Sequence, residues 1–426
     1  MVSGWVDTRR DHGGIVFLDL RDRSGILQVV CQADLVKDIK EEYVVEIEGL
    51  VKERPERMVN AELVTGKVEL QGEAFKVLAQ AQQLPFDIKN LNVGLPVLLD
   101  WRPLAFKNAK IQEIFQVQEI IVDSFRQTLK NLDFLEFQAP VIVPANAEGG
   151  AAVFHVDYYD SDAYLAQSPQ LYKQIMVGGF ERVFTVTKVF RAEPSVTTRH
   201  LAEYTSLDAE MGFISSWEEL MATIQVIVKN VISDLSKKPH LSLPQVSENI
   251  PRLKMREAQE IIFQKTGRDN RQEPDLAPDD EKDICEYAKE KYGSDFIFIT
   301  HYPTKKRPFY TFADPQDPDY TLSFDLLCRG LEIVTGGQRI NEYDKLVANI
   351  KKWGNKPADF EYYLQAFKYG LPPEGGFAIG LERLTKQIMG LENIREASTF
   401  PRDMERIDQR LSVAETKKKT KKKVKK

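Results

Sequence analysis

The stretch VFTVTKVFRAEPSVTTRHLAEYTSLDAEMGF, residues 183–213, carries the strongest fold signal of the chain, because it predicts two antiparallel strands joined by a loop. Side chains alternate between the two faces of a strand, so the first strand places Arg191 and Glu193 on one face. The second strand separates apolar from polar side chains, and its polar face consists of Tyr204, Ser206, Asp208 and Glu210.

Two interpretations of this hairpin follow from the residues. An ordinary half-buried hairpin turns its polar side chains to water. Three carboxylates, an arginine and an aromatic ring on one face fit better as the floor of a site for a charged, planar ligand. The loop adds Arg199 and His200 above that floor. The planar fork of an arginine favours phosphate or carboxylate recognition, since it can donate two parallel hydrogen bonds.

The sequences FRAE, TTRH and LDAEM in this hairpin resemble motif 2 of the class II aminoacyl-tRNA synthetases, and more narrowly the aspartyl branch. The Gly-rich stretch LPPEGGFAIGLERL, followed by a predicted helix, resembles motif 3 of the same family. The resemblance implies that Arg191 binds the α-phosphate of ATP and that Arg383 binds the γ-phosphate. It places adenine between Tyr204 and Arg383, and the other implied ATP-binding residues are Glu193, Arg199, His200 and Glu332.

The stretch AQSPQLYKQIMVGG predicts a helix. Ser168 suits the N-cap, Pro169 the first helical position, and Gly178 with Gly179 the end. On residue type alone, a lysine on such a helix is solvated. The motif QSPQLYKQ resembles the aspartyl branch, in which Lys173 pairs with the side-chain carboxylate of the substrate. Gln170 and Ser168 are then expected at the backbone end of the substrate.

A second cation comes from LEIVTGGQR, which predicts a strand, a turn at Gly336-Gly337 and then Arg339. Two cations, Lys173 and Arg339, suit an anionic side chain, because a neutral one leaves a buried charge unpaired at a cost of about several kcal/mol. We expect Asp208 to bind the substrate ammonium. The resemblance assigns a further ammonium contact to Glu148.

The resemblance also implies a magnesium site. Its candidate ligands are Glu332 and Glu210, with Thr335 as a third, and oxygen ligands are what magnesium on phosphates prefers. The residues expected to carry the chemistry are Arg191, Glu332 and Arg383. Catalysis then consists mostly of positioning and charge stabilisation.

Short strands with Gly-rich turns in residues 1–85 suggest a small Greek-key barrel. The sequences GWV, RRDHGG and IVFLDLRD resemble the anticodon-binding OB barrel of the aspartyl branch. By that resemblance Phe17 stacks on an anticodon base, Gln28 and Glu69 read base edges, and Arg10 supports the tRNA backbone.

The predicted fold is therefore α+β, with an N-terminal five-stranded OB-type barrel and a class II catalytic domain whose antiparallel sheet is flanked by helices. We expect a linker over residues 86–107, a catalytic domain over 108–410 and a disordered lysine-rich tail over 411–426. The amphipathic stretch 108–131 and the strand LEFQAPVIV, which Pro140 interrupts, resemble motif 1, which implies a homodimer. An ordinary core helix and strand fit that pattern equally well.

Composition limits the remaining possibilities. The net charge of −6 over 426 residues does not by itself indicate a nucleic-acid partner. The three cysteines show no CxxC spacing, which argues against a zinc site or a disulfide framework and is consistent with the cytoplasm. The sequence shows no signal peptide and no apolar run of membrane-spanning length.

The resemblance therefore implies ATP- and Mg²⁺-dependent activation of L-aspartate to aspartyl-adenylate, followed by transfer to the 3′ end of tRNA(Asp). One alternative is a relaxed ligase that also charges tRNA(Asn). The resemblance implies that His12 favours this alternative, because bacterial-type relatives with relaxed anticodon reading carry histidine there, and that Arg57 disfavours it, because relaxed forms tend to carry a small residue at that position. The other is a non-catalytic synthetase-like RNA-binding protein. The presence of Arg191, Glu332 and Arg383 argues against the latter.

Overall fold

The computed structural model describes residues 1–144, 153–194 and 196–407. The chain divides into two units, Met1–Val93 and Gly94–Lys426, and the division falls inside the stretch that the sequence predicts as a linker. The predicted contact Glu148 and the predicted tail 411–426 lie outside the described residues. No helix in the described part of the chain is long and apolar enough to cross a membrane.

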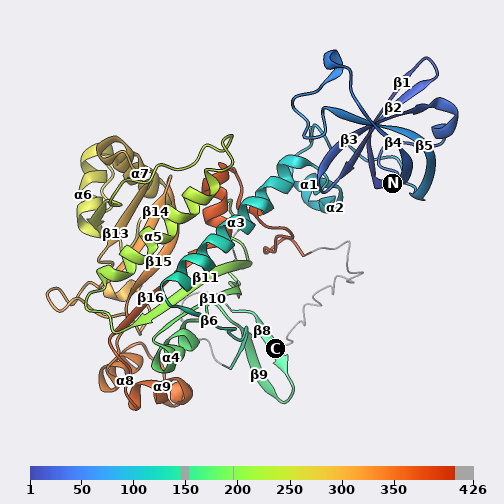
Figure 1. Cartoon of the computed structure of the whole chain (residues 1–426). Coiled ribbons are helices and arrows are strands. Elements are labelled where there is room, and N and C mark those ends of the chain that lie inside the picture. The colour runs from blue at the N-terminus through green and yellow to red at the C-terminus, as the bar shows by residue number, and fades with distance from the viewer. Residues whose placement is uncertain (145–152, 195, 408–426) are drawn as a thin grey trace, which may run out of the picture. The chain divides into compact units, whose positions relative to one another are not determined.

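The first unit is a closed barrel in the strand order β1-β2-β3-β5-β4, which confirms the predicted five-stranded OB-type barrel (Figure 1). Alternate side chains of the strands, such as Val16, Leu18 and Leu20, fill its core because successive residues face opposite sides. The strands are β1 (Val2–His12), β2 (Ile15–Asp22), β3 (Gly25–Gln32), β4 (Val44–Glu53) and β5 (Val68–Ala79).

The second unit is built on an eight-stranded sheet in the order β12-β13-β14-β15-β16-β11-β10-β6. Its central strands are antiparallel, and β10 and β11 form the predicted hairpin. Within this sheet, as far as the structure describes it, only the edge pairs β6–β10 and β12–β13 are parallel. The strands are β6 (Leu135–Glu136), β10 (Arg182–Phe190), β11 (Glu203–Gly212), β12 (Arg252–Lys254), β13 (Phe296–Thr300), β14 (Ser323–Cys328), β15 (Leu331–Gln338) and β16 (Glu374–Gly380).

Helices cover this sheet in three groups (Figure 1). α3 (Ala109–Asn131), α5 (Glu218–Leu235) and α10 (Leu381–Met389) pack on it through the largest apolar core. α6 (Met255–Thr266) and α7 (Pro278–Tyr292) pack beside β13, while α4 (Gln170–Phe180), α8 (Tyr343–Lys352) and α9 (Glu361–Lys368) share another core. The remaining elements are α1 (Leu95–Asp100), α2 (Arg102–Ala105) and a small sheet of β7 (Ile142–Val143), β8 (His155–Tyr158) and β9 (Ser161–Leu165).

Two predicted ends of elements are wrong, and both involve glycines. α4 starts at Gln170 and runs through Gly178 and Gly179, ending only where Glu181 takes a left-handed φ of 62°. β15 likewise continues through Gly336 and Gly337 without a turn. At Gly336 a Cβ would crowd the ring of Phe324, so this glycine allows close packing across the sheet.

Two strand predictions also need correction. The predicted interruption of the stretch 135–143 at Pro140 agrees with the structure, but the two halves are separate strands, because β6 and β7 belong to different sheets. Proline cannot donate the ladder hydrogen bond that a continuous strand requires. β10 ends at Phe190, so Arg191 and Glu193 lie in the connection beyond it rather than on a strand face.

Candidate functional site

A buried charged cluster joins α4 to β11 and to the end of β15. The Nζ atom of Lys173 lies 2.8 Å from Oδ1 of Asp208 and 3.1 Å from Oε2 of Glu210. Arg339 donates from Nε to Oε1 of Glu210 over 2.8 Å. Gln170 completes the cluster, since its amide donates to Glu210 over 3.2 Å and accepts from Arg339 over 3.3 Å. Four predicted aspartate-binding residues therefore meet in one place.

The two cations of this cluster are matched by two carboxylates. Burial by itself raises the pKa of Glu210, but Arg339 and Lys173 outweigh it and lower that pKa to about 2. Burial likewise lowers the pKa of Lys173, yet Asp208 and Glu210 raise it above its usual value. The carboxylates of the cluster thus balance its two cations, whereas the sequence suggested two cations that pair with an anionic substrate side chain. Ser168 lies at the start of α4, where its Oγ accepts from the N–H of Gln170 over 3.1 Å.

A third carboxyl group, Glu374 at the start of β16, adjoins the cluster and was missed by the sequence reasoning. It is fully buried, accepts from Nε2 of Gln174 over 2.6 Å and shares a hydrogen bond with Glu210. The hydroxyl of Tyr363 donates to Gln174 over 3.0 Å. Burial first, and then the charge of Glu210, raise the pKa of Glu374 well above its usual value, which favours the neutral form of this side chain. An acidic residue inside the apolar, Gly-rich stretch LPPEGG was the available signal.

A separate cavity collects all the residues predicted to bind ATP. They reach it from the connection after β10, from β11, from β15 and from α10, and they are Arg191, Glu193, Arg199, His200, Tyr204, Glu332 and Arg383. The guanidinium of Arg383 lies 3.3 Å from the carboxylate of Glu332 and also donates to its backbone carbonyl over 3.1 Å. The guanidinium of Arg191 lies 5.7 Å from the centre of the Tyr204 ring. Arginines and an aromatic ring at one cavity suit a nucleotide.

Burial and the nearby Arg383 lower the pKa of His200 below its usual value, so its imidazole is neutral at pH 7. Its Nδ1 lies 2.7 Å from Oγ1 of Thr197, within the same connection between β10 and β11. A neutral ring at this place adds no charge to the arginines of the cavity.

The predicted magnesium ligands do not lie together. Glu332 and Thr335 line the nucleotide cavity, but Glu210 does not, because Lys173 and Arg339 hold it in the other cluster. Residues missed by the sequence reasoning lie nearby, since Arg307 donates to Thr335 over 3.1 Å and to Asp325 over 2.8 Å. No group of three or more His, Cys, Asp or Glu side chains among the described residues is arranged to hold a metal by itself.

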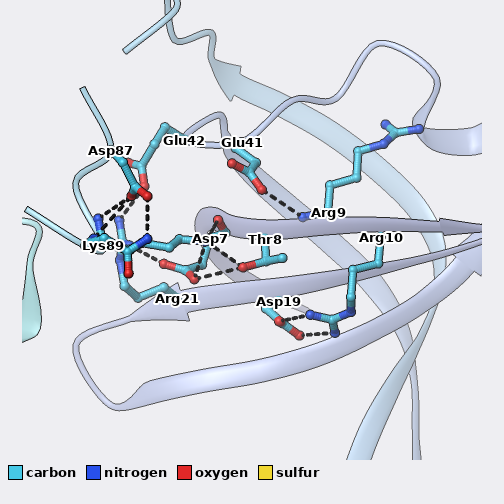
Figure 2. A network of polar contacts seen from close by, with 11 residues as sticks. Asp7, Thr8, Arg9, Arg10, Asp19, Arg21, Glu41, Glu42, Asp87 and Lys89 are labelled. Atoms are coloured by element: carbon cyan, nitrogen blue, oxygen red, sulfur yellow. Dashed lines mark hydrogen bonds and ion pairs between the residues drawn. The ribbon is translucent and has the colours of Figure 1, made fainter. Parts of the chain in front are cut away.

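The predicted anticodon-binding residues share the outward side of the barrel. In the ladders, Arg10 lies opposite Phe17 and Asp19 opposite Gln28. Gln28 donates to Glu69 over 3.0 Å. Arg10 forms a bidentate ion pair with Asp19 (Figure 2). The ring of His12 meets that of Phe17 edge-on, with 5.6 Å between their centres.

Comparisons with known proteins cover both units. The family of class II tRNA synthetases for D, K and N matches residues 95–404, and the OB-fold nucleic acid binding domain matches residues 1–78. An aspartate–tRNA(Asp/Asn) ligase of Thermus thermophilus is 44% identical over 414 residues, and an aspartate–tRNA(Asp) ligase of Pyrococcus furiosus is 36% identical over 424 residues; each alignment covers 95% of both chains. The crystal structure of the asparaginyl-tRNA synthetase from Pyrococcus horikoshii complexed with asparaginyl-adenylate matches with a TM-score of 0.85 and 30% identity, over 95% of each chain.

Proposed function

The chain belongs to the class II tRNA synthetases of the aspartate, lysine and asparagine group, and we propose that it is an aspartate–tRNA ligase. It uses ATP to convert L-aspartate to aspartyl-adenylate and transfers the aspartyl group to the 3′ end of tRNA(Asp). The observation that carries this proposal is the buried cluster in which Lys173 and Arg339 face two carboxylates.

This cluster favours aspartate by its charge. The substrate brings one ammonium and one side-chain carboxylate, so Asp208 can pair with the ammonium while Lys173 and Arg339 take the carboxylate. Cations and anions then remain equal in number, provided that Glu374 stays neutral. Asparagine brings the ammonium without the carboxylate, which leaves a buried cation under-compensated. A lysine side chain adds a further cation beside two others.

ATP is expected in the cavity that its predicted ligands line. Arg191 and Arg383 would neutralise phosphate oxygens, and adenine would stack on Tyr204. The α-carboxylate of aspartate then attacks the α-phosphorus in line and pyrophosphate leaves, a reaction that depends on positioning and on charge stabilisation. Glu332 and Thr335 fit a magnesium ion that is held mainly by phosphates, since such an ion needs only one or two protein ligands. When bound, the ion would neutralise phosphate charge.

A second candidate function is the charging of both tRNA(Asp) and tRNA(Asn). The contact between His12 and Phe17 on the predicted anticodon-binding face favours it, as does the similarity to the Thermus thermophilus ligase for both tRNAs. Arg57 points to the stricter enzyme. The proposal of an aspartate–tRNA ligase, strict or relaxed, also includes a homodimer that forms through the motif 1 region and a cytoplasmic location.

The proposal is tested by aspartate-dependent exchange of pyrophosphate into ATP. We expect Arg191→Ala to abolish the exchange. Lys173→Leu should weaken the use of aspartate by about 3–5 kcal/mol in free energy, because it removes the cation that pairs with Asp208 and one of the two that pair with Glu210. Lys237→Leu serves as the control, since that lysine is 79% exposed. Near wild-type exchange by either pocket variant contradicts the assigned sites.

Charging assays with the two tRNAs then separate the candidate functions. Aspartate attached to tRNA(Asp) alone supports the strict ligase, and equal charging of tRNA(Asn) supports the relaxed one. Binding of tRNA without any ATP turnover would leave only the non-catalytic alternative.

A further inference from the structure

Glu281 lies in the first turn of α7, in a part of the sequence that carries no functional motif. Its side chain is only 11% exposed. The carboxylate forms an ion pair with Arg199, and it accepts a hydrogen bond from the backbone N–H of Glu332 over 3.2 Å. One buried carboxylate therefore joins two segments that both line the nucleotide cavity.

Arg199 needs support from outside its own segment. The described residues between β10 and β11 form neither helix nor strand. The local contact of Arg199 itself is made by its backbone, as its N–H donates to Oγ1 of Thr197 over 3.1 Å. The charged end of Arg199 is held by Glu281, which is 82 residues further along the chain.

Fixing this arginine in advance favours ligand binding. A free arginine side chain carries about 2 kcal/mol of rotamer entropy, part of which is lost when it binds a ligand. Orienting the side chain beforehand removes that loss from the binding step. A guanidinium has five donors, so the bond from Nη2 to Glu281 leaves others for a phosphate.

We propose that Glu281 is a positioning residue that holds Arg199 and the start of β15 in place for ATP. The inference rests on the proposed function, because it assigns Glu281 to the nucleotide half of that reaction. Glu281 has no contact with Lys173, Arg339 or the other groups of the aspartate cluster in the described structure. Its effect is therefore confined to ATP.

A purely structural role makes a different prediction. A carboxylate that only ties α7 to the sheet affects the stability of the fold and, through it, both substrates alike. The ratio of the KM for ATP to the KM for aspartate separates the two roles, because a general loss of folded protein leaves both KM values unchanged.

The test measures pyrophosphate exchange while ATP and aspartate are varied separately. Glu281→Ala should raise the KM for ATP about tenfold, which corresponds to about 1.4 kcal/mol, and change the KM for aspartate by less than about twofold. Glu290→Ala is the matched control, as Glu290 lies on the same helix and is 71% exposed. An unchanged KM for ATP in Glu281→Ala, or an equal rise in both KM values, overturns the inference.

A double-mutant cycle tests whether Glu281 acts through Arg199. In an Arg199→Ala background, Glu281→Ala should raise the KM for ATP by much less than about tenfold, because one of the two groups that it positions is already gone and only its contact with the start of β15 remains. Fully additive effects contradict the positioning role.

Failure of the proposed function gives a different result. If the wild-type protein shows no aspartate-dependent exchange, the aspartate–tRNA ligase assignment falls, and calorimetric titration with ATP then tests Glu281 directly. Weaker ATP binding by Glu281→Ala than by Glu290→Ala supports the inference in that case, and equal binding overturns it.

Discussion

At the scale of single residues, the neutral state of Glu374 follows from its surroundings rather than from its type. Two carboxyl groups in hydrogen-bond contact inside a protein cannot both be ionised without a large loss of free energy. Glu210 keeps its charge because Arg339 and Lys173 bind it, so the proton stays on Glu374. The same proton preserves the charge balance that aspartate requires.

This proton makes the stability of the protein depend on pH. The pKa of Glu374 is raised above its ordinary value of 4.5, so the stability from its buried proton is fully present below pH 4.5 and is lost as the pH rises through the folded-state pKa. Glu374→Gln keeps one donor and one acceptor and carries no such proton. We expect the free energy of unfolding of the wild type to fall relative to Glu374→Gln by about 1.4 kcal/mol per pH unit in that window.

This difference is measured by the melting temperatures of the wild type and of Glu374→Gln, taken between about pH 5 and about pH 9 in steps of about one pH unit. Glu361→Gln, which alters an exposed glutamate at the start of α9, is the control and should follow the wild type. Parallel curves for the wild type and Glu374→Gln would show that Glu374 is ionised in the folded protein.

At the scale of elements, glycines set how closely β16 approaches β11. Gly376 lies opposite Glu210 in the ladder. A Cβ at Gly376 would overlap the Glu210 carboxylate and the carbonyl oxygen of Ala209. The strand thus needs a residue without a side chain where the charged cluster lies beside it.

Gly376→Ala should therefore displace Glu210 and disturb its pairs with Lys173 and Arg339. We expect a loss of stability of about 1–3 kcal/mol, as for other overpacked interiors, together with a raised KM for aspartate. Gly179→Ala is the contrast, because a Cβ there meets open space within α4 and should stabilise the helix by up to about 1 kcal/mol. Thermal melting and exchange assays measure both effects, and unchanged aspartate use by Gly376→Ala contradicts the argument.

At the scale of the whole molecule, the barrel unit reaches beyond its last strand. Ile88 is buried, with 2% exposed. The Nζ atom of Lys89 donates to the carbonyl of Asp7 and to Oγ1 of Thr8, each over 2.6 Å (Figure 2). Asp7 also pairs with Arg21, which binds Glu42 over 2.9 Å. These contacts attach residues that the sequence predicts as linker to the first strand of the barrel.

A fragment of residues 1–93 should therefore fold, and it should be more stable than a fragment of residues 1–85. Loss of the buried Ile88 side chain alone removes about 1.5–3 kcal/mol. Urea denaturation of the two fragments measures the difference. Lys89→Ala in the longer fragment should lose part of it, whereas Lys76→Ala, at 71% exposure, should not. Equal stability of both fragments would place the end of the barrel unit at residue 85.

Short-range patterns in the sequence were sufficient to predict the barrel, the hairpin of β10 and β11, and helices such as α3 and α10. The reason is that the periodicity of a strand or a helix can be recognised from residues close together in the sequence. The motifs also named the residues that line the nucleotide cavity. The partners of those residues could not be found in this way. Glu281, Glu374 and Arg307 come from distant segments, and the ion pair that takes Glu210 away from the predicted magnesium site forms only when α4, β11 and the end of β15 meet. Tertiary packing decided which charges are buried together, and burial is what makes their mutual pairing and protonation differ from the behaviour of the same residues in water.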